Sequence, residues 1–306
     1  MAREASTSTL SSRPLGGADS IGWSRRFAKE TRKLARRKPL GFWGLVVLLL
    51  IVAAAVLAPV IAPYGFGEVD FTRRLEGPSK DHLMGTDNLG RDLLSRILYG
   101  TRVSLGISLA AVFLSKFAAT MLALVSGYYG GWMDKILQRF VDIWIGLPTL
   151  VILITIIGVI GPGINGMVII IAITMTPNSS RLIRSVVLQV SAEAYVDAAR
   201  SMGASDARIM LKHILPNITH IVIFSATVAL GAVILIVASL GFLGYGVPPP
   251  FPDLGGMLSG DGLTFMRRQP WLALWPGLVI TVIVFSFNVF GDALRDVLDP
   301  KLRGGY

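Results

Sequence analysis

Three histidines are the first residues of this 306-residue chain to test for catalysis or metal binding. An imidazole is a general base near neutral pH and the commonest metal ligand in proteins. The topology argued below places His82 on one side of a membrane and His213 and His220 on the other. The latter two flank Pro216, so they are not held to one helix face. No Ser, His and Asp share a predicted location, and the chain has no cysteine. We therefore predict no metal site, no catalytic residue and no enzymatic activity.

Nucleotide hydrolysis would require a phosphate-binding loop, whose motif contains Gly-Lys. The sequence contains no Gly-Lys pair. The stretch "LSGDG" at 258–262 resembles the signature loop of ATP-binding cassettes. It lies in a predicted external loop without a nucleotide-binding fold around it, so we expect a simple turn there. The chain is expected to bind no cofactor of its own.

Composition and apolar runs indicate a membrane protein. The chain is 53% hydrophobic and only 16% charged, against about 25% charged residues in soluble proteins. A spanning helix needs roughly 20 mostly apolar residues. Six stretches qualify: 40–63, 103–126, 138–160, 166–184, 217–243 and 271–292. Pro148 interrupts the third and Pro177 the fourth, which indicates that these two face protein or a pathway instead of lipid.

The distribution of Lys and Arg predicts the orientation. With the N-terminus inside, twenty of the 29 basic residues lie in inside segments and eight in outside loops; Lys116 is the remaining one. Eight acidic residues match the eight outside, so the net charge of +10 is an internal excess. The excess is a topology signal and not a nucleic-acid patch. The basic segment 25–39 is predicted to lie on membrane lipid, with packing against a partner subunit as the alternative.

Lys116 is the one charge near the middle of a predicted span, where it is costly unless paired or hydrated. We expect it to pair with a carboxylate or a backbone carbonyl at a subunit seam. The alternative is a contact along a transport pathway.

The predicted external loop, 64–102, contains apolar residues at helical spacing from Leu89 to Leu98. We expect an amphipathic helix here, capped by Thr86 or Asp87 and lying on the outer surface.

A polar segment, "DAARSMGASDARIMLKHILPN" at 197–217, separates two apolar spans. Ser191 is expected to cap a first helix and Ser205 a second, with a bend at Gly203. The second helix is expected to end before Pro216, because proline disfavours the helical conformation of its predecessor. Such a helix pair, joined to a span, could serve as a lever for an external partner.

This segment resembles the "EAA" loop of permeases in binding-protein-dependent ABC importers. The resemblance rests on Asp197-Ala198-Ala199, Gly203 and Leu215-Pro216, with Asp197 where the family usually has Glu and His213 where an aliphatic residue is frequent. Further stretches are similar to the C-type permease of the dipeptide, oligopeptide and nickel group: 83–105, 126–148 and 291–303. The stretch 176–184 departs from the pattern by lacking Trp and Tyr.

The resemblance implies an all-α membrane protein with six transmembrane helices, in the architecture of a type I ABC importer permease. Its parts would be a cytoplasmic tail (1–39), a first transmembrane helix (40–63), an external loop (64–102), a core permease domain (103–294) with a coupling loop (191–216), and a cytoplasmic tail (295–306). The partners implied are a second, homologous permease, two cytoplasmic ATPases that bind ATP and Mg, and an extracytoplasmic substrate-binding protein. The coupling helix would sit in a cleft of one ATPase.

The sequence leaves the transported substrate and the functional class of the protein open. Peptide is favoured over nickel because no His-rich or acidic external site is visible. A passive channel would not need a glycine-hinged cytoplasmic lever. A membrane-embedded enzyme should show titratable groups converging at one depth, and only Lys116, Asp142 and Asp292 are available.

Overall fold

The computed structural model describes residues 39–298, in which every regular element is a helix. The expected basic segment before residue 39 and the tail after 298 lie outside the described residues. The membrane-length helices are α2 (Pro39–Val56), α4 (Leu93–Tyr129), α7 (Ile164–Ser191), α10 (Leu215–Phe242) and α13 (Trp271–Leu298). The shorter elements are α3 (Ala58–Ile61), η1 (Phe71–Arg73), α5 (Gly131–Ile145), α6 (Thr149–Ile160), α8 (Ala194–Ser201), α9 (Asp206–Ile209), η2 (Met210–Ile214), α11 (Leu254–Met257), η3 (Leu258–Gly262) and α12 (Leu263–Phe265).

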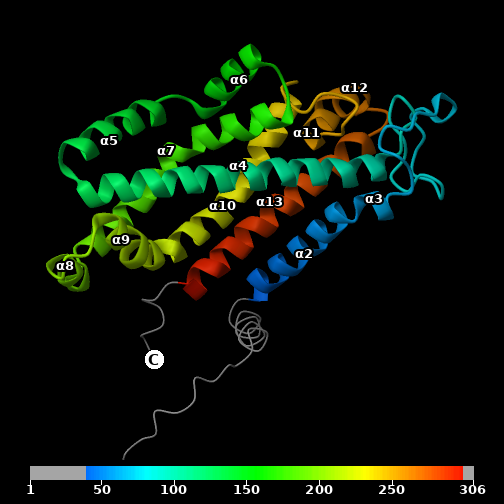
Figure 1. Ribbon diagram of the computed structural model, residues 1–306. Helices are drawn as coiled ribbons and strands as arrows, with labels where there is room; N and C mark the ends of the chain where they lie inside the picture. The colour runs from blue at the N-terminus through cyan, green and yellow to red at the C-terminus, as the bar shows by residue number, and fades with distance from the viewer. Residues whose placement is uncertain (1–38, 299–306) are drawn as a thin grey trace, which may run out of the picture.

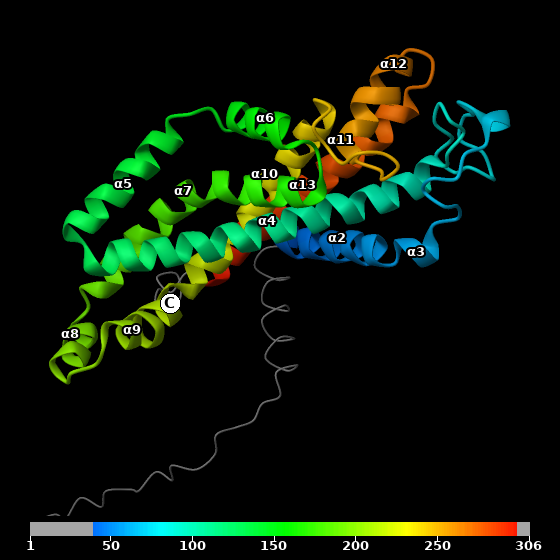
Figure 2. The same cartoon turned by 45° about the horizontal axis from the view of Figure 1, so that its top comes forward.

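Five helices of the described chain are long and apolar enough to cross a membrane, and α5 with α6 makes a sixth if this bent pair is one span. The expected all-α membrane fold is thereby confirmed. α4 packs along α7, α10 packs on α13, and α13 packs on α2 (Figure 1). Three buried apolar clusters follow one another along this bundle, and the last of them, around Ile183, Ile209 and Ile218, reaches the α8–α9 end. Figures 1 and 2 both place α8 and α9 at the end opposite the 64–92 loop.

The third predicted span is broken instead of continuous. α5 and α6 are bent by 86° relative to each other across Gly146, Leu147 and Pro148. Pro148 is the N-cap residue of α6, with extended backbone angles. Proline lacks a backbone N–H and disfavours the helical conformation of the residue before it, so the helix stops and restarts here.

The predicted surface helix and the second span are one 37-residue helix, α4, which begins at Leu93. Leu89 lies before it, and residue 102 is not an element boundary. The cap is Asp92, whose carboxylate accepts from the Ser95 N–H at 2.8 Å, and not Thr86 or Asp87. Asp87 accepts instead from the N–H groups of Leu89 and Arg91, so it closes the turn before the helix.

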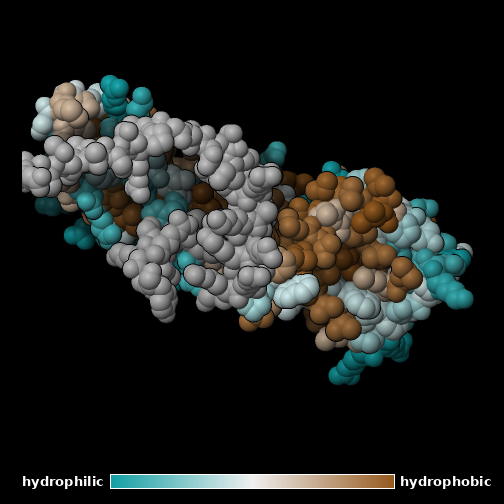
Figure 3. Space-filling model, turned by 90° about the horizontal axis from the view of Figure 1, so that it is seen from below, coloured by the Kyte–Doolittle hydropathy of each residue, from teal (hydrophilic) through white to brown (hydrophobic). Residues whose placement is uncertain are grey.

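The surface supports a membrane setting for α2. Three apolar residues of α2 are more than half exposed: Leu49 (58%), Leu50 (65%) and Val56 (63%). Figure 3, which views the molecule from below, shows apolar side chains gathered to the right of the middle, with hydrophilic ones beyond them at the right-hand end. An apolar exterior with a polar end is the pattern of a helix bundle that faces lipid.

Candidate functional site

The predicted coupling loop, residues 191–216 and here named the coupling segment, bends at Gly203 as expected. Gly203 has φ +79°, the left-handed conformation that glycine adopts without steric cost. The Gly203 N–H donates to the Arg200 carbonyl (3.0 Å), and the Ala204 N–H donates to the Ala199 carbonyl (3.1 Å). This pair of bonds is the Schellman arrangement that ends a helix at a left-handed glycine. The bend after α8 is therefore built by the backbone.

The two predicted caps are wrong in detail. Ser191 is the last residue of α7, and its hydroxyl has no hydrogen-bond partner in the described chain. The residue before α8 is Glu193, whose side chain makes no capping bond. Ser205 does precede α9, yet its hydroxyl does not bond to the helix either. The helix ends here are exposed, so solvent can satisfy the free N–H groups.

The coupling segment has a buried face and an exposed face. Val196 (0% exposed), Ala199 (3%) and Ile209 (0%) pack in the cluster shared with α4 and α7. Asp197 and Ala198 point outward, as do Gly203 and Met202, whose side chain is 81% exposed. Of the predicted site residues, Ala199 thus anchors the segment, while Asp197, Ala198 and Gly203 are available to another protein.

The second helix does not end before Pro216. α9, the π-helix η2 and α10 form one continuous helix from Asp206 to Phe242, in which Leu215 is half-buried and Pro216 exposed. In η2 the Leu215 N–H donates to the Met210 carbonyl, one residue further back than in an α-helix. Pro216 follows this π-turn inside the continuous helix, where the local departure from α-helical bonding accommodates the missing N–H of proline. α9 is therefore continuous with a membrane helix.

Two tyrosines that the sequence reasoning missed tie the coupling segment to the bundle. The Tyr128 hydroxyl, near the end of α4, donates to Asp206 (2.7 Å), and the Arg200 guanidinium lies 5.6 Å from the centre of its ring. The Tyr195 hydroxyl accepts from the Asn217 amide (3.0 Å). Tyr128 thus links α8, α9 and α4, a role that no local sequence pattern marks.

Lys116 is buried (8% exposed) between α4 and α7, and its ammonium donates to the Ser179 hydroxyl at 2.8 Å. Within residues 39–298, the ammonium of Lys116 contacts neither a carboxylate nor a backbone carbonyl, which were the partners expected. The structure brings Lys116 nowhere near the coupling segment's exposed face, because it lies within the bundle. Its role as a seam or pathway residue stays a prediction.

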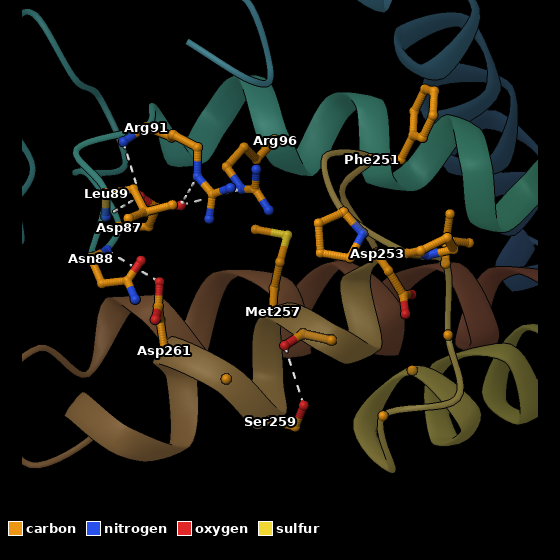
Figure 4. Close-up of a pocket in the computed structure, with 18 of the residues that line it drawn as sticks. Asp87, Asn88, Leu89, Arg91, Arg96, Phe251, Asp253, Met257, Ser259 and Asp261 are labelled. Carbon is orange, nitrogen blue, oxygen red and sulfur yellow. Dashed lines mark hydrogen bonds and ion pairs between the residues drawn. The ribbon is translucent and has the colours of Figure 1, made fainter. Parts of the chain in front are cut away.

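A second feature is a cavity of about 510 Å³ at the end of the bundle opposite α8 and α9. We call it the outer cavity. Its walls are the turn before α4, the start of α4, the loop after α10, and α11 with η3 (Figure 4). The stretch "LSGDG", expected to be a simple turn, is the π-helix η3 and forms part of this wall.

Charged side chains from two elements face the outer cavity. The Arg91 guanidinium donates to Asp87 (2.6 Å), and the Arg96 Nε lies 3.4 Å from the same carboxylate. On the η3 side, Asp261 accepts from the Asn88 N–H at 3.1 Å. Burial raises the pKa of Asp261, as does the negative charge of Asp87, while the Asn88 N–H and the two arginines oppose that rise.

Asp253 is a third acidic residue in the lining of the outer cavity. It caps α11 by accepting from the Gly255 N–H at 3.2 Å and is 6% exposed. Its carboxylate packs against Gly241 and Gly246, where an added Cβ would come within 2.0 Å of an oxygen. Burial raises the pKa of Asp253 to about 6, although backbone N–H groups of the surrounding loop lower it.

A bundle of membrane-spanning helices, with an exposed bend at one end that leads into one span, has the organisation expected of a membrane transport permease. Family comparison agrees. The model of the binding-protein-dependent transport system inner membrane component matches residues 119–304, and the N-terminal TM domain of oligopeptide transport permease C matches residues 27–78. The chain belongs to the family of binding-protein-dependent transport system inner membrane components.

Curated relatives cover nearly the whole chain. The dipeptide transport system permease protein DppC of Alkalihalophilus pseudofirmus is 39% identical over 275 residues, which is 90% of each chain. The protein of the same name from Haemophilus influenzae is 41% identical, covering 85% of this chain and 90% of the relative. The glutathione transport system permease protein GsiD of Pectobacterium atrosepticum is also 41% identical, covering 85% and 86%. The resemblance drawn from the sequence motifs is confirmed, and the chain is a multi-pass membrane permease subunit.

Proposed function

We propose that this chain imports di- or oligopeptides as one of two homologous permease subunits, driven by two cytoplasmic ATPases and supplied by an extracytoplasmic binding protein. The single observation that carries the coupling role is the exposed α8–Gly203–α9 bend on the continuous helix 206–242. Similarity to relatives named for dipeptide and glutathione transport supports the peptide substrate. ATP and Mg would bind to the ATPases, and this chain would hydrolyse no ATP.

In this proposal the coupling segment seats in a cleft of one ATPase. Asp197, Ala198 and Met202 form the contact surface, since their side chains are exposed while Val196 and Ala199 hold α8 to the bundle. Closure of the ATPase dimer would push α9, and the push would reach α10 without an intervening flexible joint. The permease would then alternate between outward and inward access.

The proposed orientation has both termini in the cytoplasm of a bacterial cell, which the excess of internal Lys and Arg supports. Cysteines can test it, because the chain has none of its own. Gly67→Cys should react with an impermeant thiol reagent in intact cells, and Ser205→Cys should react only after lysis; both positions are exposed. The reverse pattern would overturn the orientation and place the coupling segment outside.

The substrate is tested by reconstituting the five-protein importer, two permeases, two ATPases and the binding protein, in liposomes. ATP-dependent uptake of labelled dialanine is expected, and omission of this chain should abolish it. Uptake of nickel ions in place of peptide would refute the peptide assignment while leaving the permease role intact.

A further inference from the structure

The outer cavity carries opposite charges on two adjoining walls, which meet where Asp261 accepts from the Asn88 N–H. Arg91 and Arg96 project from the α4 side, and Asp261 from η3 (Figure 4). The two arginine side chains are 15% and 9% exposed, so both are largely withdrawn from bulk water. In such a setting an ionic contact with a ligand is stronger than at an open surface.

Both charged walls retain free hydrogen-bonding capacity. Arg91 uses its Nε on Asp87, and within residues 39–298 its two terminal nitrogens donate to nothing. Arg96 donates one terminal nitrogen to the Phe66 carbonyl at 3.1 Å. Asp87 therefore shares one negative charge between two guanidinium groups. A guanidinium with adjacent free N–H groups binds a carboxylate in bidentate fashion.

On the other wall, one oxygen of Asp261 accepts from the Asn88 N–H, and no group of the described chain donates to its other oxygen. That oxygen can accept from an ammonium group. The carboxylate of Asp253 is not an alternative, because it is enclosed by glycine backbone and by the Gly255 N–H.

The size and lining suit a peptide main chain. The volume of about 510 Å³ lies in the range of small-molecule sites, roughly 300–1,000 Å³. Gly244 and Gly260 line the cavity, and an added Cβ at either would meet no atom within 4 Å. Glycine walls let a ligand approach the backbone and select little on side chains.

We propose that the outer cavity is a binding site for the two charged ends of a short peptide. The ligand's carboxylate would lie on the guanidinium groups of Arg91 and Arg96, and its ammonium on the free oxygen of Asp261. This inference rests on the proposed peptide substrate. It adds a site at which the permease itself binds the two charged ends of the peptide and makes no contact specific to the peptide side chains.

The test uses Ser259→Cys, since Ser259 is half-buried and lines the cavity (Figure 4). It would be the only thiol on this chain. In the complex of permeases and ATPases, prepared without the binding protein, labelling of this subunit by N-ethylmaleimide is timed with and without millimolar dialanine. Dialanine should slow labelling at least twofold, whereas N-acetyl-dialanine amide, which lacks both charges, should not. Gly67→Cys, in open space on the external loop, is the matched control and should be unaffected by either compound.

Two further variants assign the ends. With Arg91→Gln, protection by N-acetyl-dialanine, which keeps only the carboxylate, should be lost. With Asp261→Asn, dialanine should protect no better than N-acetyl-dialanine does. Unchanged co-purification of each variant with the second permease and the two ATPases would show that it keeps its fold.

Equal protection by the charged and the capped peptide, or none by either, would overturn the inference. Dialanine uptake by the wild-type importer distinguishes failure of the cavity site from failure of the proposed peptide substrate. Uptake without protection refutes the cavity site alone, and absence of uptake refutes the proposed peptide substrate.

Discussion

Replacing Gly203 with valine should uncouple transport from ATP hydrolysis. Gly203 has φ +79°, and an added Cβ would meet no atom within 4 Å. The cost is therefore backbone strain and not collision. A β-branched residue held in the left-handed region costs on the order of 1–3 kcal/mol. If the turn opens to relieve this strain, it loses the two bonds from Gly203 and Ala204, each with a net value of about 1 kcal/mol.

Either outcome shifts the bend by an energy comparable to a coupling free energy, which is typically 1–3 kcal/mol. Because 1.4 kcal/mol corresponds to a factor of ten, we expect uptake to fall about tenfold or more. Gly203→Asn should keep most uptake, since asparagine tolerates the left-handed conformation. Gly67→Val is the matched control, because Gly67 also lies in open space but does not have a positive φ.

The assay is ATP hydrolysis and peptide uptake measured on the same reconstituted importer. The expected signature for Gly203→Val is lost uptake with the subunit still assembled in the membrane. Wild-type uptake would show that this stretch is an ordinary loop, and the coupling assignment would fall. An equal loss in Gly67→Val would trace the defect to valine in general and would also refute the argument.

Three further outcomes are expected. Gly90→Ala should destabilise the external loop far more than any alanine placed in open space, because its Cβ would lie 1.7 Å from the Asp70 carbonyl oxygen at φ +76°; limited proteolysis reports this. Asp134→Asn should lower the free energy of unfolding by about 1–3 kcal/mol, because the ion pair of Asp134 with Arg184 of α7 is largely buried. Asp142→Asn should lower it by under about 1 kcal/mol, because the ion pair of Asp142 with Arg181 is half-exposed. Thermal unfolding of both variants checks this order. Burial raises the pKa of Asp253 to about 6 from 3.8, so the folded state binds a proton before the unfolded state does as pH falls from 7 to 5. The free energy of unfolding should therefore rise by on the order of 1 kcal/mol over this range. The matching rise in Tm should be absent in Asp253→Asn.

The sequence predicted the spans well, because a run of about 20 apolar residues leaves the backbone few alternatives to a helix in lipid. It did not predict where helices start. The periodicity from Leu89 to Leu98 is real, yet the turn is fixed by Asp87, which accepts from the Leu89 and Arg91 N–H groups, and the cap by Asp92, which accepts from the Ser95 N–H. Choosing between two nearby carboxylates requires the tertiary position of the loop.

The coupling segment shows the same limit. The bend at Gly203 follows from local backbone preference and was predictable. The continuation through Pro216 was not, because the tendency of a residue before proline to avoid the helix is overridden here by the π-turn at Met210–Ile214 and by burial of Ile214 and Ile218. The link from Tyr128 to Asp206 joins positions 78 residues apart in sequence and carries no local signal.

The continuous helix 206–242 connects the two candidate sites. With 37 residues it is about 55 Å long, at 1.5 Å per residue. A tilt of only about 5° around one end would move the other by roughly 5 Å, the rise of one helical turn. Next to its far end, Gly241 packs against Asp253 on the wall of the outer cavity with no room for a Cβ. Because Gly241 and Asp253 are in tight contact, motion of α9 in an ATPase cleft would be expected to change the shape of the outer cavity directly. No series of side-chain rearrangements through the bundle would be needed.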